Sequence, residues 1–227
     1  GILSIQPQFM GSFAICMAIA FAVPFLLTAI AGKKRLQAVP AGQTAELAEI
    51  AAVAGSSAAA GVMAAKMGET EANEKPAGKL TAFLSGTAIP LAEVKDGVFS
   101  EGILGDGMAI IPESDTLYAP ADAEIAALMP DSRHACGLKL ENGMEVLLHI
   151  GIDTVGMNGD GFEYLVQEGQ KVCAGTPLIK FDRAKIRAAG HPDVTVCIIS
   201  NMGNAKDIRF HTGMGVKENE TAVATFQ

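Results

Sequence analysis

The first 32 residues contain no charged side chain and no histidine. Within them, residues 9–31 are apolar and long enough to cross a bilayer core of about 30 Å. A secretory signal peptide is the alternative, but it would begin with methionine and carry its positive charges before the apolar run, and both are lacking here. Lys33, Lys34 and Arg35 follow the run instead, which marks a cytoplasmic end. We therefore predict one transmembrane helix, with the rest of the chain in the cytoplasm.

The sequence also lacks a Cys-x-x-Cys pair and an excess of basic residues. Its 4 cysteines stand apart, which is typical of buried thiols in a reducing compartment. The formal net charge is −8, and this acidic balance argues against nucleic acid as a partner. A basic protein is the kind of partner that such a charge favours.

Composition divides the chain into three parts. Residues 37–79 are rich in alanine, glycine, serine and glutamate, contain no aromatic residue, and have Pro40 and Pro76 near their ends. Such a segment buries too little apolar surface to offset the entropy lost on ordering, so we interpret it as a flexible linker. We therefore assign residues 1–36 to a membrane part, residues 37–79 to the linker and residues 80–227 to a folded domain.

The third part consists of short apolar runs separated by turn signals such as Asn142-Gly143 and Gly159-Asp160-Gly161. This pattern predicts an all-β domain, an antiparallel sandwich or barrel. The predicted strands span residues 108–111, 124–128, 135–140, 145–150, 177–181 and 194–199. One helix is predicted over residues 182–189, with Asp182 as its N-cap and Gly190 just past its end.

Two of the 4 histidines stand at the ends of neighbouring predicted strands: His134 opens one and His149 closes the next. Between them lies Asn142-Gly143, the dipeptide most typical of a two-residue type I′ hairpin. With that turn, Cys136 would lie opposite His149. Gly151 would then lie opposite His134, and both imidazoles would project from one face of the sheet. A three-residue loop would instead place them on opposite faces.

Two neighbouring imidazoles suit more than one chemistry. Together with Asp153 they could ligate zinc, as in a zinc-dependent peptidase-like domain, although no His-x-His pair accompanies them. In a phosphoryl relay, a neutral His149 would attack the phosphoryl group while His134 donates a hydrogen bond to its oxygens. That relay needs the other ring N–H of His149 to be held by an acceptor, and the carbonyl of Gly151 is close in sequence. The residues alone leave both chemistries open.

A series of strings in residues 85–226 resembles the glucose-type IIA domains of the bacterial phosphotransferase system. The most specific is His149-Ile150-Gly151-Ile152-Asp153-Thr154-Val155. The others, in chain order, are Gly105-Asp106-Gly107-Met108-Ala109-Ile110, Ala119-Pro120-Ala121-Asp122, His134-Ala135, Gly159-Asp160-Gly161-Phe162, Glu168-Gly169-Gln170-Lys171-Val172 and Ile198-Ile199-Ser200-Asn201-Met202. Residues 1–36 resemble, less specifically, the last helix of a IIC membrane domain. The chain is thus similar to the C-terminal part of a glucoside- or sucrose-type IIBCA sugar permease, and we expect it to be a fragment of one.

The resemblance implies a phosphotransferase that carries phosphate during sugar uptake. His149 would be phosphorylated at Nε2 by the phosphohistidine of HPr, and His134 would stabilise the phosphoryl group. Ser132 would supply a hydroxyl at the place where the family usually has threonine. The phosphoryl group would then pass to a cysteine of a IIB domain and on to the sugar, which only the IIC and IIB parts would bind. No cofactor is implied, and zinc at the two histidines would be adventitious.

The resemblance also implies a docking face for HPr and IIB. Asp96 and Asp153 match positions that meet a basic side chain of HPr, although either could be an ordinary turn or solvated carboxylate. Val98, Phe99 and Leu147 match apolar positions of that face, and Leu147 stands where an aromatic residue is common. A purely regulatory, protein-binding role for the same face is an alternative, in which phosphorylation acts by adding negative charge at an apolar contact.

Overall fold

The computed structural model describes residues 78–227. The predicted transmembrane helix and all but the last two residues of the predicted linker lie outside the described residues. Within the described part, no helix combines the length and the apolar character that a membrane crossing requires.

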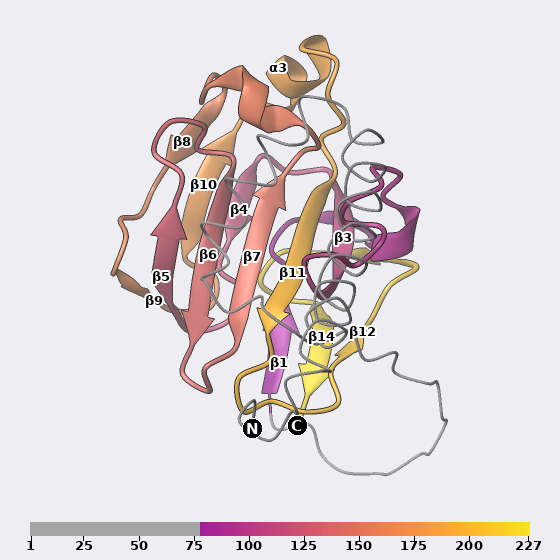
Figure 1. The fold of residues 1–227 in the computed structure, drawn as a ribbon, viewed down its shortest axis with the longest axis vertical. Helices are drawn as coiled ribbons and strands as arrows, with labels where there is room; N and C mark the ends of the chain where they lie inside the picture. Colours follow the sequence, from indigo (N-terminus) through magenta and orange to yellow (C-terminus); the bar gives the residue numbers. More distant parts are fainter. Residues whose placement is uncertain (1–77) are drawn as a thin grey trace, which may run out of the picture. The chain divides into compact units, whose positions relative to one another are not determined.

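The described residues form three antiparallel sheets, which together make the predicted all-β domain (Figure 1). The large sheet has the strand order β13-β2-β3-β11-β7-β6-β5-β9. Its strands are β2 (Gly86–Pro90), β3 (Asp106–Pro112), β5 (Ala123–Leu128), β6 (Ala135–Leu140), β7 (Glu145–Ile150), β9 (Lys171–Val172), β11 (Thr195–Asn201) and β13 (Met214–Val216).

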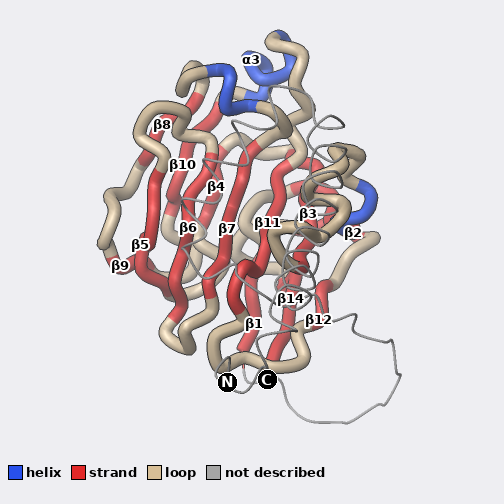
Figure 2. Tube along the Cα trace, viewed as in Figure 1, coloured by secondary structure: helices blue, strands red, loops and turns tan. Residues whose placement is uncertain are grey.

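Two three-stranded sheets complete the domain, with the orders β4-β10-β8 and β1-β14-β12. Their strands are β4 (Thr116–Tyr118), β10 (Pro177–Phe181), β8 (Phe162–Tyr164), β1 (Gly78–Thr81), β14 (Ala222–Phe226) and β12 (Arg209–Phe210). Three short helical segments lie at the margins of these sheets (Figure 2), namely η3 (Leu91–Glu93), η4 (Thr154–Met157) and α3 (Arg183–Ala188).

The local signals in the sequence predict several of these elements well. The bounds predicted for β6, β7 and β10 are confirmed. The predicted helix is also confirmed, because the side chain of Asp182 accepts a hydrogen bond from the N–H of Lys185 at the start of α3. Gly190 follows the helix with a φ of 88°, a conformation that glycine adopts without strain.

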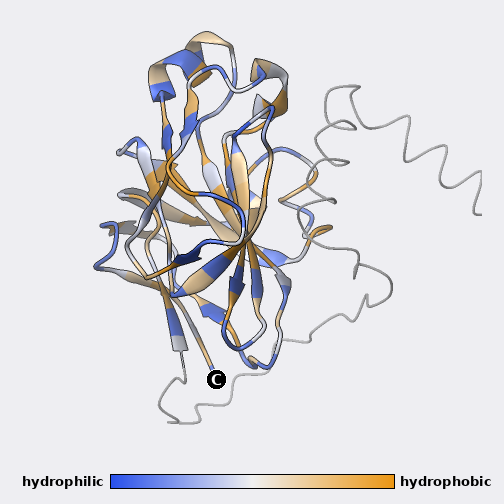
Figure 3. Cartoon of the chain, turned by 90° about the vertical axis from the view of Figure 1, so that its left-hand side faces the viewer, coloured by the Kyte–Doolittle hydropathy of each residue, from blue (hydrophilic) through white to orange (hydrophobic). Residues whose placement is uncertain are grey.

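The main core lies between the sheets, where the inward residues of the strands are buried (Figure 3). A second apolar cluster lies on the other face of the large sheet, under the segment that runs from η3 to β3. Leu91 and Phe99 of that segment pack there against Leu147 of β7 and Val196 of β11. Burial on both faces explains why β7 and β11 are apolar almost throughout rather than alternating.

The hairpin between β6 and β7 differs from the sequence prediction, because its loop has three residues rather than two. The N–H of Leu140 donates to the carbonyl of Met144 at 2.9 Å, which leaves residues 141–143 outside the ladder. Gly143 has a φ of 82°, whereas Asn142 is not among the residues with positive φ, as a type I′ turn would require. The carbonyl of Asn142 instead accepts a hydrogen bond from the N–H of Asn204, in a distant loop. The three-residue loop thus occurs together with a tertiary contact that the local sequence does not reveal.

The longer loop moves the register of the two strands by one residue. Ala135, rather than Cys136, lies opposite His149. The N–H of Ile150, rather than that of Gly151, donates to the carbonyl of His134 at 2.8 Å. The predicted pairings are therefore wrong, and by strict alternation His134 and His149 belong to opposite faces of the sheet.

Candidate functional site

The rings of His134 and His149 nevertheless meet. Their centroids lie 4.5 Å apart and their planes are inclined by 83°, so that the edge of one ring points at the face of the other. Both side chains are buried, with 0% of their surface exposed. The sequence-based expectation of two neighbouring imidazoles is thus confirmed, although the turn from which it was derived is not the one that forms.

The two rings can meet because His134 stands just outside β6, where the alternation of a strand no longer holds. Arg133, the residue before it, has a φ of 56°, which turns the chain sharply. The ring of His134 also contacts Phe162 of β8, with centroids 6.5 Å apart. On its other side, the ring of His149 contacts Phe99, at 5.0 Å. The pair therefore sits where β6 begins and β7 ends, between the main core and the second apolar cluster.

A backbone carbonyl fixes the tautomer of His149. Its Nδ1 lies 2.9 Å from the carbonyl oxygen of Gly151, which can only accept, so Nδ1 carries the hydrogen and the neutral ring keeps its lone pair on Nε2. Gly151 itself has a φ of 77°, and a Cβ there would come within 2.4 Å of the Cγ2 of Thr154. The hydroxyl of Thr154 donates to the carbonyl of Ile150 at 2.7 Å. The turn after β7 is thus built around a glycine that aims its carbonyl at the histidine.

Burial keeps both imidazoles uncharged. It lowers the pKa of His149 from 6.5 to about 4, although the Gly151 hydrogen bond and the nearby charges of Asp96 and Asp153 oppose this shift. The pKa of His134 falls to about 2, first through burial and then through the proximity of His149. Near pH 7 the site therefore holds two neutral imidazoles, one of them with its Nε2 lone pair oriented by the backbone.

The two predicted acidic residues lie near His149, since both charges act on its pKa. Asp96 also shapes the segment that carries Phe99. Its carboxylate accepts hydrogen bonds from the N–H of Phe99 at 2.9 Å and of Ser100 at 3.0 Å. Asp153 has a left-handed backbone, with a φ of 58°, and immediately precedes η4. Asp96 thus shapes a turn, as the alternative reading has it, and its part in meeting a partner stays a prediction.

The other predicted site residues are all buried, and one of them, Phe99, contacts a ring of the pair. Ser132 lies in the loop before His134 and is 2% exposed. Phe99 touches the ring of His149, and Leu147 lies two residues before that histidine in β7, within the second apolar cluster. Val98 is 7% exposed. The part that these residues would take in partner binding stays a prediction.

The zinc alternative finds no support in the described part of the chain. Among residues 78–227, no three histidine, cysteine or acidic side chains are grouped so that they could hold a metal ion. The suggested ligands His134, His149 and Asp153 do not form such a group.

Two residues of β8 contribute to the site without having been predicted. Phe162 contacts the ring of His134, and Tyr164 hydrogen-bonds the backbone of Ala135, next to that histidine. Both contacts join segments nearly 30 residues apart in the sequence. Phe162 does stand in a string that resembles the phosphotransferase domains, but nothing in its local pattern shows that β8 lies beside His134.

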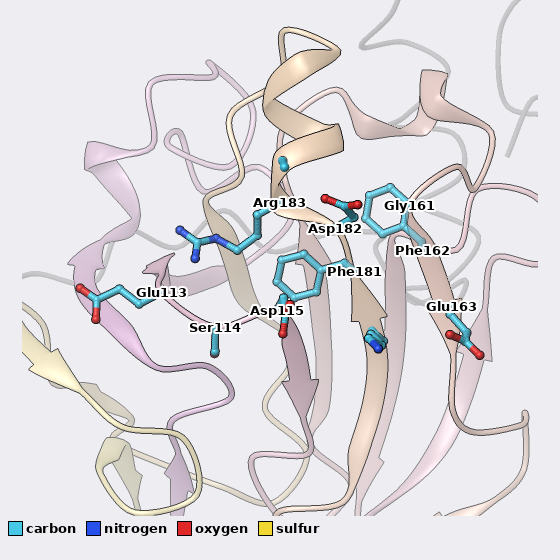
Figure 4. Close-up of a pocket in the computed structure, with 11 residues that line it drawn as sticks. Glu113, Ser114, Asp115, Gly161, Phe162, Glu163, Phe181, Asp182 and Arg183 are labelled. Atoms are coloured by element: carbon cyan, nitrogen blue, oxygen red, sulfur yellow. The ribbon is translucent and has the colours of Figure 1, made fainter.

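A groove of about 670 Å³ lies elsewhere, between the start of α3 and the β4-β10-β8 sheet (Figure 4). Charged side chains such as Asp115, Lys180 and Arg183 line it, and neither histidine of the pair does. The guanidinium of Arg183 is already engaged, because its Nε lies 3.0 Å from the carboxylate of Asp193. The groove holds none of the predicted site residues.

Known proteins with similar sequences belong to the sugar phosphotransferase system. Residues 78–205 match the sequence model of the family described as phosphoenolpyruvate-dependent sugar phosphotransferase system, EIIA 1. The glucose-specific EIIBCA component of Corynebacterium glutamicum is 45% identical over 130 residues, which are 57% of this chain and 19% of that protein. The glucoside-specific EIICBA component of Staphylococcus carnosus is 41% identical over 130 residues, again 57% of this chain and 19% of the relative. The chain thus matches about a fifth of the length of these relatives.

A solved structure has the same fold. The glucose permease IIA from Mycoplasma capricolum is 38% identical in sequence and superposes with a TM-score of 0.59. The match covers 65% of this chain and 94% of that one. The likeness therefore extends over nearly the whole of the other domain.

Proposed function

The chain belongs to the phosphoenolpyruvate-dependent sugar phosphotransferase system EIIA 1 family, and on that premise we propose that it is the phosphocarrier of a sugar permease. His149 accepts a phosphoryl group from the phosphohistidine of HPr and hands it to a cysteine of a IIB domain, which phosphorylates the incoming sugar. The observation that carries this proposal is the pair of neutral imidazoles, with His149 held at Nδ1 by the carbonyl of Gly151 and His134 edge-on at 4.5 Å.

Each transfer exchanges one bond to phosphorus for another. In the first step the Nε2 lone pair of His149 attacks the phosphorus, the new N–P bond forms, and the bond to the donor histidine breaks with its electron pair returning to that ring. In the second step a cysteine thiolate attacks and His149 leaves as a neutral imidazole. Because the protein forms no other covalent bond, catalysis consists of in-line positioning and of hydrogen bonds to the phosphoryl oxygens. A neutral His134 has one N–H to donate, and the hydroxyl of Ser132 is a second donor in the same loop.

The acidic residues at the site suit a basic partner surface. Asp96 and Asp153 both act on His149 electrostatically, so a cationic side chain that approaches the phosphoryl group would meet two carboxylates. The chain as a whole has a net charge of −8, which would speed association with a basic protein such as HPr. Val98, Phe99 and Leu147 would supply the apolar part of this docking face.

The remaining parts of the chain would attach the carrier to the membrane. Residues 1–36 would be the last IIC helix, and residues 37–79 would tether the domain on the cytoplasmic side of the bacterial membrane. A short flexible tether holds donor and acceptor at an effective concentration of about millimolar. No cofactor is needed, because the phosphoryl group moves directly between side chains, and any zinc at His134 and His149 would be adventitious.

Phosphorylation by the purified components tests the proposal. The chain is incubated with phosphoenolpyruvate, the general phosphotransfer enzyme and HPr, and the phosphorylated residue is mapped. We expect His149→Ala to abolish labelling, and His134→Gln to permit labelling but impair transfer to IIB. His211→Gln is the control, because His211 pairs with Thr225 in the β1-β14-β12 region of the domain. Persistent labelling of the His149→Ala variant would rule the assignment out.

A further inference from the structure

The hydroxyl of Tyr164 joins the two ends of the loop that carries His134. Its oxygen accepts a hydrogen bond from the N–H of Met129 at 2.9 Å and donates one to the carbonyl of Ala135 at 2.5 Å. The carbonyl of Met129 in turn accepts from the N–H of Arg133 at 2.9 Å. A single side chain of β8, which belongs to another sheet, thus closes the loop of residues 129–135.

This loop has a conformation that needs support. Arg133 lies in the left-handed region, with a φ of 56°, which a residue with a Cβ adopts only at a cost in energy. Met129 and Ala135, whose backbone groups the tyrosine holds, are 3% and 0% exposed. A buried backbone donor or acceptor that loses its partner carries a desolvation cost, so removal of the hydroxyl favours a shift of the loop that finds new partners.

The position of the His134 ring depends strongly on the conformation of this loop. Within the described residues, neither of its ring nitrogens has a hydrogen-bond partner, so no side-chain bond fixes the ring. Its position follows from the backbone on either side and from ring contacts with His149 and Phe162. Phe162 and Tyr164 are two residues apart in β8 and therefore share a face. From that face, Phe162 contacts the ring of His134, and Tyr164 hydrogen-bonds the carbonyl of Ala135, the residue after His134.

We propose that Tyr164 is a positioning residue for phosphoryl transfer: by bridging Met129 and Ala135, its hydroxyl sets where His134 meets the phosphoryl group on His149. This inference rests on the proposed function. His149 has supports that do not involve Tyr164, namely the pairing of β7 with β11 and the carbonyl of Gly151. Loss of the hydroxyl should therefore displace the stabilising ring and leave the nucleophile where it is.

The sequence offers a matched control, because it has only 2 tyrosines. Tyr118 lies in β4, on the other side of β10 from β8 in the same three-stranded sheet. Tyr164→Phe and Tyr118→Phe each remove one hydroxyl from this sheet. In the full chain, the rate of phosphate acceptance from phospho-HPr and the rate of donation to IIB are measured separately for both variants.

We expect Tyr164→Phe to slow donation by between about tenfold and about a hundredfold, which is the effect of small misplacements in positioned transfers, with a much smaller change in acceptance. Its His134 ring signals in a proton–nitrogen correlation spectrum should move more than those of His149, which keeps its own bond to Gly151. Tyr118→Phe should change neither the rates nor the spectrum. An equal fall in both rates, or an unmoved His134 signal, would show that the tyrosine only stabilises the fold and would overturn the inference.

A second measurement keeps the hydroxyl and so does not depend on how well Tyr164→Phe folds. Growth of the Tyr118→Phe variant on 3-fluorotyrosine places one fluorine label, at position 164. Its resonance should shift when His149 becomes phosphorylated, because the loop it holds carries the ring that meets the phosphoryl group. An unchanged resonance in a fully phosphorylated sample would overturn the inference while leaving the proposed function intact. If the unmodified chain takes up no phosphate on His149, the proposed function itself fails.

Discussion

His134 and His149 meet edge to face at 4.5 Å, although the pairing of β6 with β7 assigns them to opposite faces of the sheet. The contact between the two rings depends on the residue at which β6 begins, which is Ala135. Had β6 begun one or two residues earlier, alternation would have directed the two rings to different sides. The two imidazoles thus come together at the open end of the β6–β7 hairpin, where the backbone before β6 can turn one ring toward the other.

The depressed pKa values of the two histidines predict how stability responds to acid. Each ring binds a proton more readily in the unfolded chain, where its pKa is near 6.5, than in the fold, where it is about 4 for His149 and about 2 for His134. Their contribution to stability is therefore complete above pH 6.5 and is lost as the pH falls toward 4 and below. At about 1.4 kcal/mol per pKa unit, the loss for His149 alone amounts to about 3 kcal/mol.

Urea unfolding at pH values between 7 and 4 measures this loss. The double variant His134→Gln/His149→Gln retains every carboxylate and lacks both imidazoles. We expect the free energy of unfolding to fall more steeply with acid in the natural sequence than in the double variant. Parallel curves would contradict the prediction and show that the two rings titrate normally in the fold.

The sequence predicted this site through local signals and missed what distant segments supply. The bounds of β6 and β7 and the cap at Asp182 follow from patterns a few residues long. The hairpin prediction is wrong, because Asn142 does not adopt the positive φ of a type I′ turn, and its carbonyl accepts a hydrogen bond from Asn204, far along the chain. Tyr164 could not be predicted for the same reason, since its partners Met129 and Ala135 are 35 and 29 residues away.

The carbonyl that holds His149 depends on Gly151, and an alanine there should disturb it. The residue has a φ of 77°, and an added Cβ would lie 2.4 Å from Thr154 and 3.1 Å from the carbonyl of Pro192. We expect Gly151→Ala to destabilise the domain by about 1–3 kcal/mol and to slow phosphorylation of His149. Gly156→Ala is the matched control, because nothing lies within 4 Å of a Cβ at that position. Thermal melting and labelling by phospho-HPr measure both effects, and similar results for the two variants would contradict the prediction.

Asp193 should matter more to stability than the exposed ion pairs of the domain. One of its oxygens lies 3.0 Å from Arg183 and 2.7 Å from Arg187, and its side chain is 11% exposed. The neighbouring carbonyls of Pro192 and Val194 hold the turn after His149. We expect Asp193→Asn to lower the free energy of unfolding by about 1–3 kcal/mol, because two guanidinium groups lose a charged partner.

The matched control for that variant is the exposed pair of Lys185 and Asp160. These side chains are 2.6 Å apart, but 51% and 71% of their surfaces are exposed. Asp160→Asn should change the free energy of unfolding much less than Asp193→Asn does, since solvent screens such pairs. Urea titration of the two variants side by side gives the comparison. An effect of Asp160→Asn as large as that of Asp193→Asn would mean that burial does not decide the strength of these pairs.

The place of Gly78, where the proposed linker joins the domain, predicts how the length of that linker would affect phosphoryl transfer to IIB. Gly78 lines a pocket together with Glu141 and Asn142, at the beginning of β7, whereas His149 stands near the other end of that strand (Figure 1). If residues 37–77 form the proposed tether, they join the domain at the end of the sheet away from the histidines, and they would have to reach around the domain for His149 to face an acceptor. A chain of n residues spans at most about 3.5 Å per residue, so removing most of residues 37–77 would restrict that reach.

In a permease that carries IIB on the same polypeptide, we expect this deletion to slow donation to IIB far more than acceptance from HPr, which diffuses freely. A glycine and serine segment of the original length should restore the rate, because reach rather than sequence is at issue. Rapid-quench measurement of the two half-reactions separates the steps. Equal slowing of both, or no rescue by the replacement segment, would mean that residues 37–77 do more than tether.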